Sequence, residues 1–568
     1  MMKRSVLIPL AAAMMFASAA HAERGSDGEL KILYWQAPSI LNPFLSGGTK
    51  DIHASSLIIE PLAHYDTDGN LVPTLAEEIP TVGNGGVSAD LRTITWKLKQ
   101  GVVWSDGSPF TAHDVVFTAD YCLHPEGGCN AAERFQDVES VEALDDHTVK
   151  ITFGVAKPFP YGPFVGSEVP VFQKAQYQDC MGAKAPECTE QNFGTIGTGP
   201  FKVREFRPND VVLYEMNENY RIPGKPHFSS VLLKGGGDAV SAARAVLETG
   251  EFDYAWNLQV EPEILSTMES AGKGEVLSAF GTSVERLMVQ LTNPDKTLGD
   301  KRATYQNGNN PHPFLSDPAV RRALSMAIDR QILVDAGYGP AGRVTCNVLP
   351  APAIYASKAN DWCKTQNIEG ANKLLDDAGW EHGSDGVRAK DGVRLSILYQ
   401  TSTNSVRQGT QALIKQMWQE IGVETELRNI SASVFFGGDQ SSPDTFQKFF
   451  ADIEMYTNNF NGTDPENYML RWTCDKMPSP ETQWIGQNMP RYCSAQYDEL
   501  ASELSQTAEL KDRARIAKQM NDMLIDYGAM IPLIHRGGVA ARANSLGGGA
   551  YPNVWDATPW NIQDWHRK

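Results

Sequence analysis

The stretch GTIGTGPFKVREFRPNDVVLYEMNENYR, residues 194–221, allows two interpretations. Its glycines could cradle a phosphate, or they could form a turn that leads into a β-hairpin. A Walker-type phosphate loop needs Lys followed by Ser or Thr after its last glycine, and no Lys-Ser or Lys-Thr pair follows these glycines. A dinucleotide-binding loop needs a helix next, whereas FKVREF alternates like a strand. Because RPND then turns the chain and VVLYEM returns, we predict a β-hairpin over 197–217.

The N-terminal residues have the composition of a secretory signal peptide. A basic start, MMKR, precedes the apolar run SVLIPLAAAMMFASAA, and AHA supplies the small residues of a cleavage site. We therefore expect a signal peptide over residues 1–22 and cleavage before Glu23. A transmembrane anchor is the alternative, but the run is slightly short for one. Because no cysteine precedes Cys122, we expect no lipid-modified cysteine and place the mature protein free in the periplasm.

The chain of 568 residues is acidic, with 50 Lys and Arg against 69 Asp and Glu and a net charge of −19. Proteins that bind nucleic acid cluster Lys and Arg, so this charge argues against nucleic acid as a partner. Hydrophobic residues make up 42% of the chain, which also has 12 tryptophans. This composition predicts well-packed globular lobes rather than disorder.

The eight cysteines fall into four pairs that are close in sequence. In an exported chain this pattern predicts four local disulfides. Metal ligation is the alternative, but no C-x-x-C motif occurs and histidines are few, so we expect no metal site. The predicted pairs are Cys122–Cys129, Cys180–Cys188, Cys346–Cys363 and Cys474–Cys493.

Strand signals dominate residues 30–250, and helices alternate with strands from about 285 to 535. This order predicts two α/β lobes, with the last strand returning to the first lobe. Ser316 or Asp317 is expected to cap the first helix of the second half. The predicted strands cover 29–35, 93–104, 147–153, 210–217 and 530–543. The predicted helices cover 316–334, 369–380, 406–422 and 510–528.

Several motifs in a fixed order resemble the large solute-binding proteins of peptide-class ABC importers, family 5, which include oligopeptide, dipeptide, nickel and opine receptors. The motifs are IIEPLAHYDTDGNLVPTLAEEIP (58–80), TITWKLKQGVVWSDGSPFTAHDVVFTADY (93–121), GTGPFKVREFRPNDVVLYEMNENY (197–220), LETGEFDYAW (247–256), DPAVRRALSMAIDR (317–330), NKLLDDAGW (372–380) and IPLIH (531–535). The resemblance implies a two-lobed α/β periplasmic binding protein fold of the large type, with an extra subdomain inserted in lobe I.

The resemblance also implies a domain organisation. Lobe II is expected over 285–534. Lobe I is expected to have an inserted subdomain over 61–195 and a core over 23–60, 196–284 and 535–568. A small-molecule or oligopeptide ligand would lie in the cleft, and the permease subunits of an importer would recognise the closed form, reached by a hinge motion. We expect a monomer without a cofactor.

No catalysis is implied by this resemblance, and the sequence has no H-E-x-x-H and no G-x-S-x-G motif. An exported hydrolase of peptides or glycosides is the alternative from another class. Its best candidate acids, Asp376 and Asp377, are adjacent on a predicted helix, and adjacent residues do not face each other. A solvated charged face explains them better.

Members of the family build their cleft from loops that follow certain strands. The matching loops here are 34–51, 256–262, 399–408 and 456–472. Their aromatic and polar side chains could stack on a ligand or hydrogen-bond to it, although core packing is the alternative for the tryptophans. The candidate ligand-binding residues are Trp35, Asn42, Trp256, Asn257, Gln259, Thr401, Asn404, Arg407, Asn461 and Asp464.

Two of these positions bear on the class of ligand. Peptide-binding members usually hold the ligand's amine with an aspartate three residues before the acidic residue of an acidic-Pro step. Here that step begins at Asp464, so the matching residue is Asn461, which carries no charge to neutralise an ammonium. Asp464 could replace it only if its side chain turns inward.

Dipeptide-specific members also bind the ligand's carboxylate with an arginine before the helix that matches 406–422. The matching residue here is Thr401, with Arg407 close by. Both ends of a free dipeptide thus lack their usual partners, and we expect simple dipeptides to bind poorly. A longer peptide held by its backbone is expected instead, or a non-peptide solute such as an opine, an oligosaccharide or a sugar conjugate.

Overall fold

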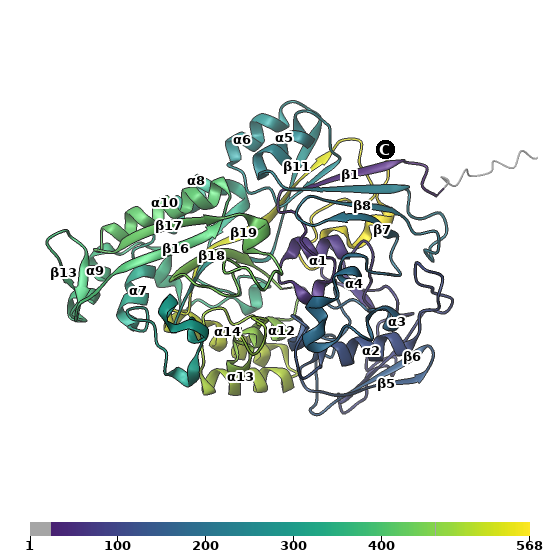
Figure 1. Ribbon diagram of the computed structural model, residues 1–568, viewed down its shortest axis with the longest axis horizontal. Coiled ribbons are helices and arrows are strands. Elements are labelled where there is room, and N and C mark those ends of the chain that lie inside the picture. Colours follow the sequence, from purple (N-terminus) through teal and green to yellow (C-terminus); the bar gives the residue numbers. More distant parts are fainter. Residues whose placement is uncertain (1–23, 461) are drawn as a thin grey trace, which may run out of the picture.

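The computed structural model describes residues 24–460 and 462–568 of the chain. Two long antiparallel strands, β11 (Gly274–Val289) and β19 (Met530–Ala543), connect two lobes that lie side by side in Figure 1. They form the centre of an 11-stranded sheet to which both lobes contribute. The signal peptide predicted over residues 1–22 lies outside the described residues.

Lobe I supplies the strands β1 (Glu29–Tyr34), β7 (Phe201–Arg207), β8 (Val211–Met216), β9 (Ser230–Gly235) and β10 (Tyr254–Trp256). β10 pairs antiparallel with β19 and parallel with β1, and β1 pairs parallel with β9. β8 and β7 complete this side as an antiparallel hairpin. The hairpin predicted from the opening stretch is therefore confirmed.

The glycines of that stretch serve close backbone packing. The Gly199 amide donates to the Ile58 carbonyl oxygen at 2.7 Å. A Cβ atom at Gly197 would lie 1.8 Å from the same oxygen. Only a residue without a side chain allows this approach. Close backbone packing therefore explains these glycines, and no phosphate is needed to explain them.

Lobe II supplies the strands β16 (Ser396–Ser402), β17 (Glu424–Ile430) and β18 (Ile453–Asn458), and the short β12 (Gly342–Val344) pairs with β19. β18 pairs antiparallel with β11, whereas β16 pairs parallel with both β18 and β17. The pairing of β11 with β19 is interrupted between Phe280 and Val284, where the two strands pass between the lobes. Such an irregularity lets paired strands bend.

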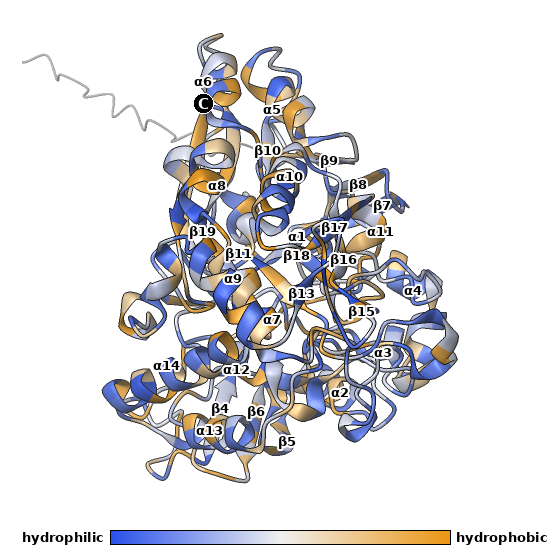
Figure 2. Cartoon of the chain, turned by 90° about the vertical axis from the view of Figure 1, so that its left-hand side faces the viewer, coloured by the Kyte–Doolittle hydropathy of each residue, from blue (hydrophilic) through white to orange (hydrophobic). Residues whose placement is uncertain are grey.

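Helices pack beside the lobe II strands (Figure 1), and Figure 2 shows both apolar and polar residues along them. One prediction is wrong: the helix expected over 316–334 is two helices. The Asp317 side chain caps the first, as predicted, by accepting from Ala319 N. Asp329 accepts from two further backbone amides and starts the second. A side chain that caps a new helix competes with continuation of the helix before it. The helices are α7 (Pro318–Met326), α8 (Arg330–Gly337), α9 (Ile368–Asp377), α10 (Ser405–Gln419), α13 (Ala495–Gln506) and α14 (Leu510–Tyr527).

Small sheets and helices follow β1 in lobe I. The strand predicted over 93–104 ends early, at Lys97, because the chain turns at Gly101, whose φ is +71°. The elements are α1 (Thr49–Ser55), β2 (Ala63–Tyr65), β3 (Leu71–Pro73), β4 (Thr93–Lys97), α2 (Ala112–Cys122), β5 (Val138–Asp145), β6 (Thr148–Phe153), α3 (Lys174–Tyr177) and α4 (Thr189–Phe193). α5 (Ala239–Leu247) and α6 (Pro262–Glu269) come later.

The buried apolar side chains form separate cores for the two lobes. The largest cluster takes its residues from 287–534. A second combines residues from 30–256 with others from 540–565, and a third packs α5 and α6 beside the sheet. The chain therefore leaves lobe I once and returns to it through β19. The domain boundaries given above stay a prediction.

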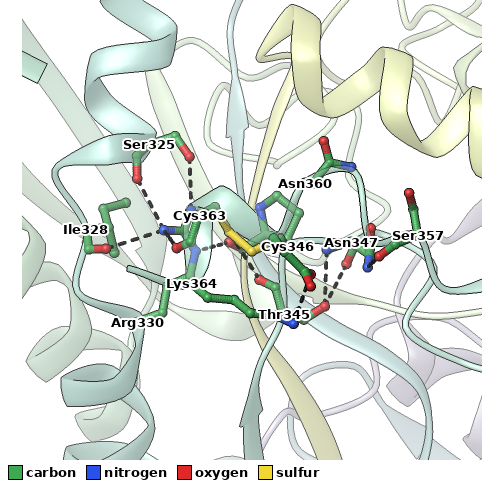
Figure 3. Close-up of a disulfide and its surroundings, with 12 residues drawn as sticks. Ser325, Ile328, Arg330, Thr345, Cys346, Asn347, Ser357, Asn360, Cys363 and Lys364 are labelled. Atoms are coloured by element: carbon green, nitrogen blue, oxygen red, sulfur yellow. Dashed lines mark hydrogen bonds and ion pairs between the residues drawn. A yellow bond between two sulfur atoms is a disulfide. The ribbon is translucent and has the colours of Figure 1, made fainter. Parts of the chain in front are cut away.

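All four disulfides form as predicted, with sequence separations of 7, 8, 17 and 19 residues. Figure 3 shows the surroundings of Cys346–Cys363. The buried Arg330 guanidinium donates to the Cys363 carbonyl oxygen at 2.9 Å and to that of Ser325 at 3.2 Å. The disulfide joins Cys346 to Cys363, and the Arg330 hydrogen bond holds the Cys363 segment at the start of α8.

Replacing both Cys346 and Cys363 by serine should lower the free energy of unfolding by about 3 kcal/mol, because the unfolded chain gains the entropy of the opened loop. Urea denaturation of the double variant and the parent protein would measure this loss. A midpoint that is equal in the two proteins would contradict the prediction. Peptide mapping without reductant should recover each of the four disulfides separately.

Candidate functional site

A cavity with about 1530 Å³ of unfilled space, part of it open to solvent, lies where the lobes meet. Lobe I contributes the loops after β1 and β10 and the segment 552–558. Lobe II contributes the end of β18, the first turn of α10, and Phe436, Phe446, Arg471 and Gln487. β19 itself lines it over 536–540. A cavity shared by two lobes across connecting strands suits a ligand that both lobes grip.

An aromatic group forms one wall of this cavity. Trp256, at the end of β10, stacks on Tyr34 with ring centroids 4.6 Å apart and an angle of 18° between the rings. The His53 ring meets Trp256 edge-on at 5.2 Å, and its Nδ1 lies 3.0 Å from the Tyr34 hydroxyl. Trp256 is half-buried and lines the cavity, so its ring can offer an apolar surface to a ligand.

Burial in this wall lowers the pKa of His53 to about 3, against an opposing effect of Asp556. The folded pKa lies below the unfolded value of about 6.5. Between these values the unfolded chain binds a proton that the folded protein does not. Stability is therefore fully present above pH 6.5 and is lost as the pH falls towards 3.

His53→Gln should flatten this pH dependence. In the parent protein His53 should contribute a slope of up to about 1.4 kcal/mol per pH unit between pH 6 and pH 4. Urea denaturation of both proteins at pH 7, 6, 5 and 4 would measure the difference in slope. Parallel profiles for the two proteins would show that His53 does not titrate in this way.

A buried ion pair lies beside the cavity. Arg407, in the first turn of α10, donates from Nε to Glu285 Oε1 at 2.9 Å, and Glu285 is fully buried on β11. Burial raises the pKa of Glu285, but the guanidinium groups of Arg407 and Arg536 outweigh it and hold that pKa below its ordinary value. Arg407 lines the cavity with its charge already neutralised.

Further ion pairs join the two lobes around the cavity. Arg471 of lobe II lies 3.4 Å from Glu133 Oε1 and 3.2 Å from Glu168 Oε2, both in lobe I. Arg134 also pairs with Glu168. Burial raises the pKa of Glu168, but Arg134 and Arg471 outweigh that effect and lower it. Lining carboxylates are thus neutralised from across the lobe boundary, which stabilises closed lobes.

Three of the residues proposed from the sequence line the cavity: Trp256, Asn257 and Arg407. Asn257 follows Trp256 with a φ of +59°. Its amide donates to Gln36 Oε1 at 3.1 Å, and its oxygen accepts from Arg536. It therefore holds two other lining side chains in place.

Trp35 and Asn42 lie away from the lining. Trp35 packs in the small core beside α5, and its Nε1 donates to the Asn257 carbonyl oxygen at 2.7 Å. Asn42 is fully buried and donates to Asn192 Oδ1 at 2.9 Å and to the Tyr121 hydroxyl at 3.2 Å. The core-packing alternative thus describes Trp35 better than a ligand contact does.

Gln259, Thr401 and Asn404 are also buried with protein partners. The Gln259 amide donates to Glu285 Oε2 at 3.2 Å, and the Thr401 hydroxyl donates to the Met455 carbonyl oxygen at 2.7 Å. Asn404 caps α10, and its amide donates to the Gln259 carbonyl oxygen at 3.2 Å. These side chains support the Arg407 region rather than line the cavity.

Asp464 turns away from the cavity. Arg513 of α14 donates to both of its carboxylate oxygens, at 2.9 and 2.5 Å. The inward orientation that would replace the family's amine-binding aspartate is therefore absent at Asp464. The other candidate for that role, Asn461, lies outside the described residues.

Several lining residues were missed from the sequence: His53, Glu133, Glu168, Arg471 and Arg536. Four of them lie in loops or helices whose packing against distant segments cannot be read from local patterns. Arg536 had a usable signal, because it is a charge inside the otherwise apolar run MIPLIHRGGV of a predicted strand.

Comparison with known proteins gives a family match and similar chains. A family model described as bacterial extracellular solute-binding proteins, family 5 Middle, matches residues 70–479. Protein XP55 of Streptomyces lividans is 29% identical over 399 residues, which span 70% of this chain and 66% of XP55, just under two thirds of its length. The glutathione-binding protein GsiB of Escherichia coli (strain K12) is 23% identical over 508 residues, which span 89% of each chain.

Solved structures show the same fold. The oligopeptide-binding protein AppA of Bacillus subtilis, in complex with a nonapeptide, matches with a TM-score of 0.81 and 22% identity over 96% of this chain and 100% of AppA. This likeness confirms the two-lobed α/β architecture. Within residues 24–460 and 462–568, no helix is both long and apolar enough to cross a membrane.

Proposed function

The chain belongs to the family 5 bacterial extracellular solute-binding proteins, and on that premise we propose that it captures a peptide-like solute in the interlobe cavity and delivers it to the permease subunits of an ABC importer. Proteins of this family are receptors without catalytic activity, so the chain is not an enzyme. AppA holds a nonapeptide, which supports a peptide-like solute here.

The lining of the cavity carries this proposal. Neutral amide side chains gather there from both lobes, beside the Trp256 ring. Amides both donate and accept hydrogen bonds, as a peptide backbone requires, and the flat ring suits an apolar side chain. The amide residues are Gln36, Asn130, Asn257, Asn458, Asn459, Gln487 and Asn553.

Simple dipeptides should bind poorly. The charges at the positions where dipeptide-binding relatives hold the two ends of a ligand are occupied by protein partners, Asp464 by Arg513 and Arg407 by Glu285. Thr401 is buried against a carbonyl oxygen. Calorimetry with a panel of unmodified dipeptides should therefore give no submicromolar affinity. Tight binding that Asp464→Ala or Arg407→Ala abolishes would refute this proposal.

A non-peptide solute such as an opine, an oligosaccharide or a sugar conjugate is the second candidate. The same amide side chains can bind hydroxyl groups, and Trp256 can stack on a sugar ring. Neither candidate requires a free amine at the ligand's end.

A thermal-shift screen tests the proposed function. Longer peptides, opines and oligosaccharides would be added singly to the mature protein. A ligand that binds only the folded state raises the melting temperature by mass action. Hits should be recovered chemically unchanged after overnight incubation, and steady consumption of a hit by pure protein would instead favour the hydrolase interpretation.

The proposal includes a cellular place. The predicted signal peptide and the four disulfides fit an oxidising compartment outside the cytoplasm. We place the mature protein free in the periplasm as a monomer. Osmotic-shock fractionation of cells producing the tagged chain should release it with periplasmic markers, and retention in the membrane fraction would contradict this location.

A further inference from the structure

Charged side chains that line the cavity mostly have partners of opposite charge. Glu133 and Glu168 pair with Arg471, and Arg407 pairs with Glu285. Lys50 pairs with Asp51, its neighbour in sequence, at 2.8 Å. The Asp556 carboxylate is fully buried and accepts from His64 Nδ1 and from the Tyr65 and Ser167 amides.

Arg536 has no acidic partner. Its guanidinium donates to the Thr457 hydroxyl at 3.1 Å and to the Asn257 side-chain oxygen, both uncharged. Among the described residues, no carboxylate oxygen lies within 4.0 Å of an Arg536 side-chain nitrogen, the distance that defines an ion pair. The residue is only 5% exposed, and it lines the cavity on β19.

The charges of Arg536, Arg407 and Glu285 sum to one excess positive charge. The carboxylate that acts on Arg536 is that of Glu285, but it is already held by two nitrogens of Arg407. Two guanidinium groups and one carboxylate sum to +1. The adjacent Tyr338 hydroxyl adds no negative charge, because burial raises its pKa well above the ordinary value. A buried charge without a partner is costly unless something else neutralises it.

We propose that Arg536 binds a carboxylate of the solute, so that the ligand of this receptor is an acid held by that group rather than by an amine. The inference rests on the proposed function and narrows its substrate class to acidic peptides and opine-like acids. A guanidinium presents paired N–H donors that match the two oxygens of a carboxylate. Thr457 and Asn257 fix the orientation of the side chain before the ligand arrives.

The lining favours an acid over a base for a second reason. Two of the lining carboxylates, Glu133 and Glu168, are neutralised by arginines, and a third, Asp556, is fully buried and accepts from His64 and two backbone amides. Asp464 faces Arg513. A free ammonium group in the cavity would thus meet an excess positive charge at Arg536 and no free carboxylate among these groups, whereas a carboxylate would complete the charge balance.

Paired ligand sets on four proteins test the inference. The probe is a mixture of synthetic pentapeptides and opines, used as free acids and again after all carboxyl groups have been converted to methyl esters. Equilibrium dialysis followed by mass spectrometry gives the retained components. The parent protein should retain acids and not their esters. Arg536→Gln should weaken the binding of the retained acids by about 10- to 100-fold, the range of a charge-assisted contact.

Two further variants serve as controls. Arg536→Lys keeps the charge without the paired donors and should fall between the parent protein and Arg536→Gln, which also covers the case that glutamine disturbs folding. Arg343→Gln removes an exposed guanidinium of the neighbouring strand β12, which contacts Phe280 outside the cavity, and should bind like the parent protein. Circular dichroism would confirm folding of each.

The outcomes separate the inference from its premise. Equal retention of acids and esters, or unchanged affinity in Arg536→Gln, would overturn the role of Arg536 while leaving the receptor intact. An equal loss in Arg343→Gln would overturn it as well, because the effect would then be general to positive charge. If the parent protein retains neither set, the proposed peptide-like and opine-like solutes are wrong, and the inference fails with them.

Discussion

Replacing Arg407 by methionine should lower the free energy of unfolding by about 3–5 kcal/mol, because the change strands a buried carboxylate. Glu285 is fully buried, and Arg407 is 2% exposed. The pair lies where β11 meets the first turn of α10, with additional bonds from Arg407 to Ser402 and Thr457. Urea denaturation at pH 7 would measure the loss.

The double variant Arg407→Met with Glu285→Leu distinguishes a charge effect from lost packing. Removing both members leaves no unpaired carboxylate, so much of the stability should return. The exposed pair Lys373–Asp377 on α9 provides a control, and Lys373→Met should leave the midpoint unchanged. Glu285→Leu is also measured alone. If the stability losses of Arg407→Met and Glu285→Leu simply add in the double variant, the ion pair is not what stabilises this site.

Protonation of Glu285 in acid should remove the stabilising contribution of its ion pair with Arg407. The folded pKa of Glu285 is lowered, whereas the unfolded value is about 4.3. The contribution of the pair is therefore present above about pH 4.3 and is lost as the pH falls through the folded pKa. The parent protein should lose this stability in acid, and the double variant should not.

The fold was predictable where the signals are local. The hairpin over 197–217 and the four disulfides depend on nearby residues, and both are confirmed. The break between α7 and α8 was missed because the apolar period continues across it. Asp329 ends that period only by offering its carboxylate to two amides, and a capping aspartate looks the same in sequence as a solvent-exposed one.

The site was predictable at the level of loops but not of side chains. The loops after β1 and β10 do reach the cavity, yet Trp35 turns into a core while Trp256 lines the wall. Side chains alternate between the two faces of a strand, so a shift of one residue decides between these places. The ion-pair partners of Arg471 lie more than 300 residues away in the chain, and no local pattern encodes such a contact.

Arg471→Met should weaken ligand binding by about 100-fold, through closure rather than through contact. Glu133 is 4% exposed in the closed arrangement, and Arg471 is its ion-pair partner across the lobes. Without that guanidinium, closing the lobes would bury an unpaired carboxylate. Opening would return the carboxylate to water. A penalty of about 3 kcal/mol on the closed form, the lower end for a stranded charge, corresponds to this fold-change.

Small-angle X-ray scattering separates closure from contact. Without added ligand, Arg471→Met should have a larger radius of gyration than the parent protein, because the penalty falls only on closed lobes. Arg542→Met is the matched control, since its partner Glu275 lies in the same lobe, and its scattering should be that of the parent protein. If Arg471→Met weakens binding with unchanged scattering, Arg471 acts as a ligand contact. If neither changes, the ion pairs across the lobes do not govern closure, and the interrupted pairing of β11 with β19 would have to set it alone.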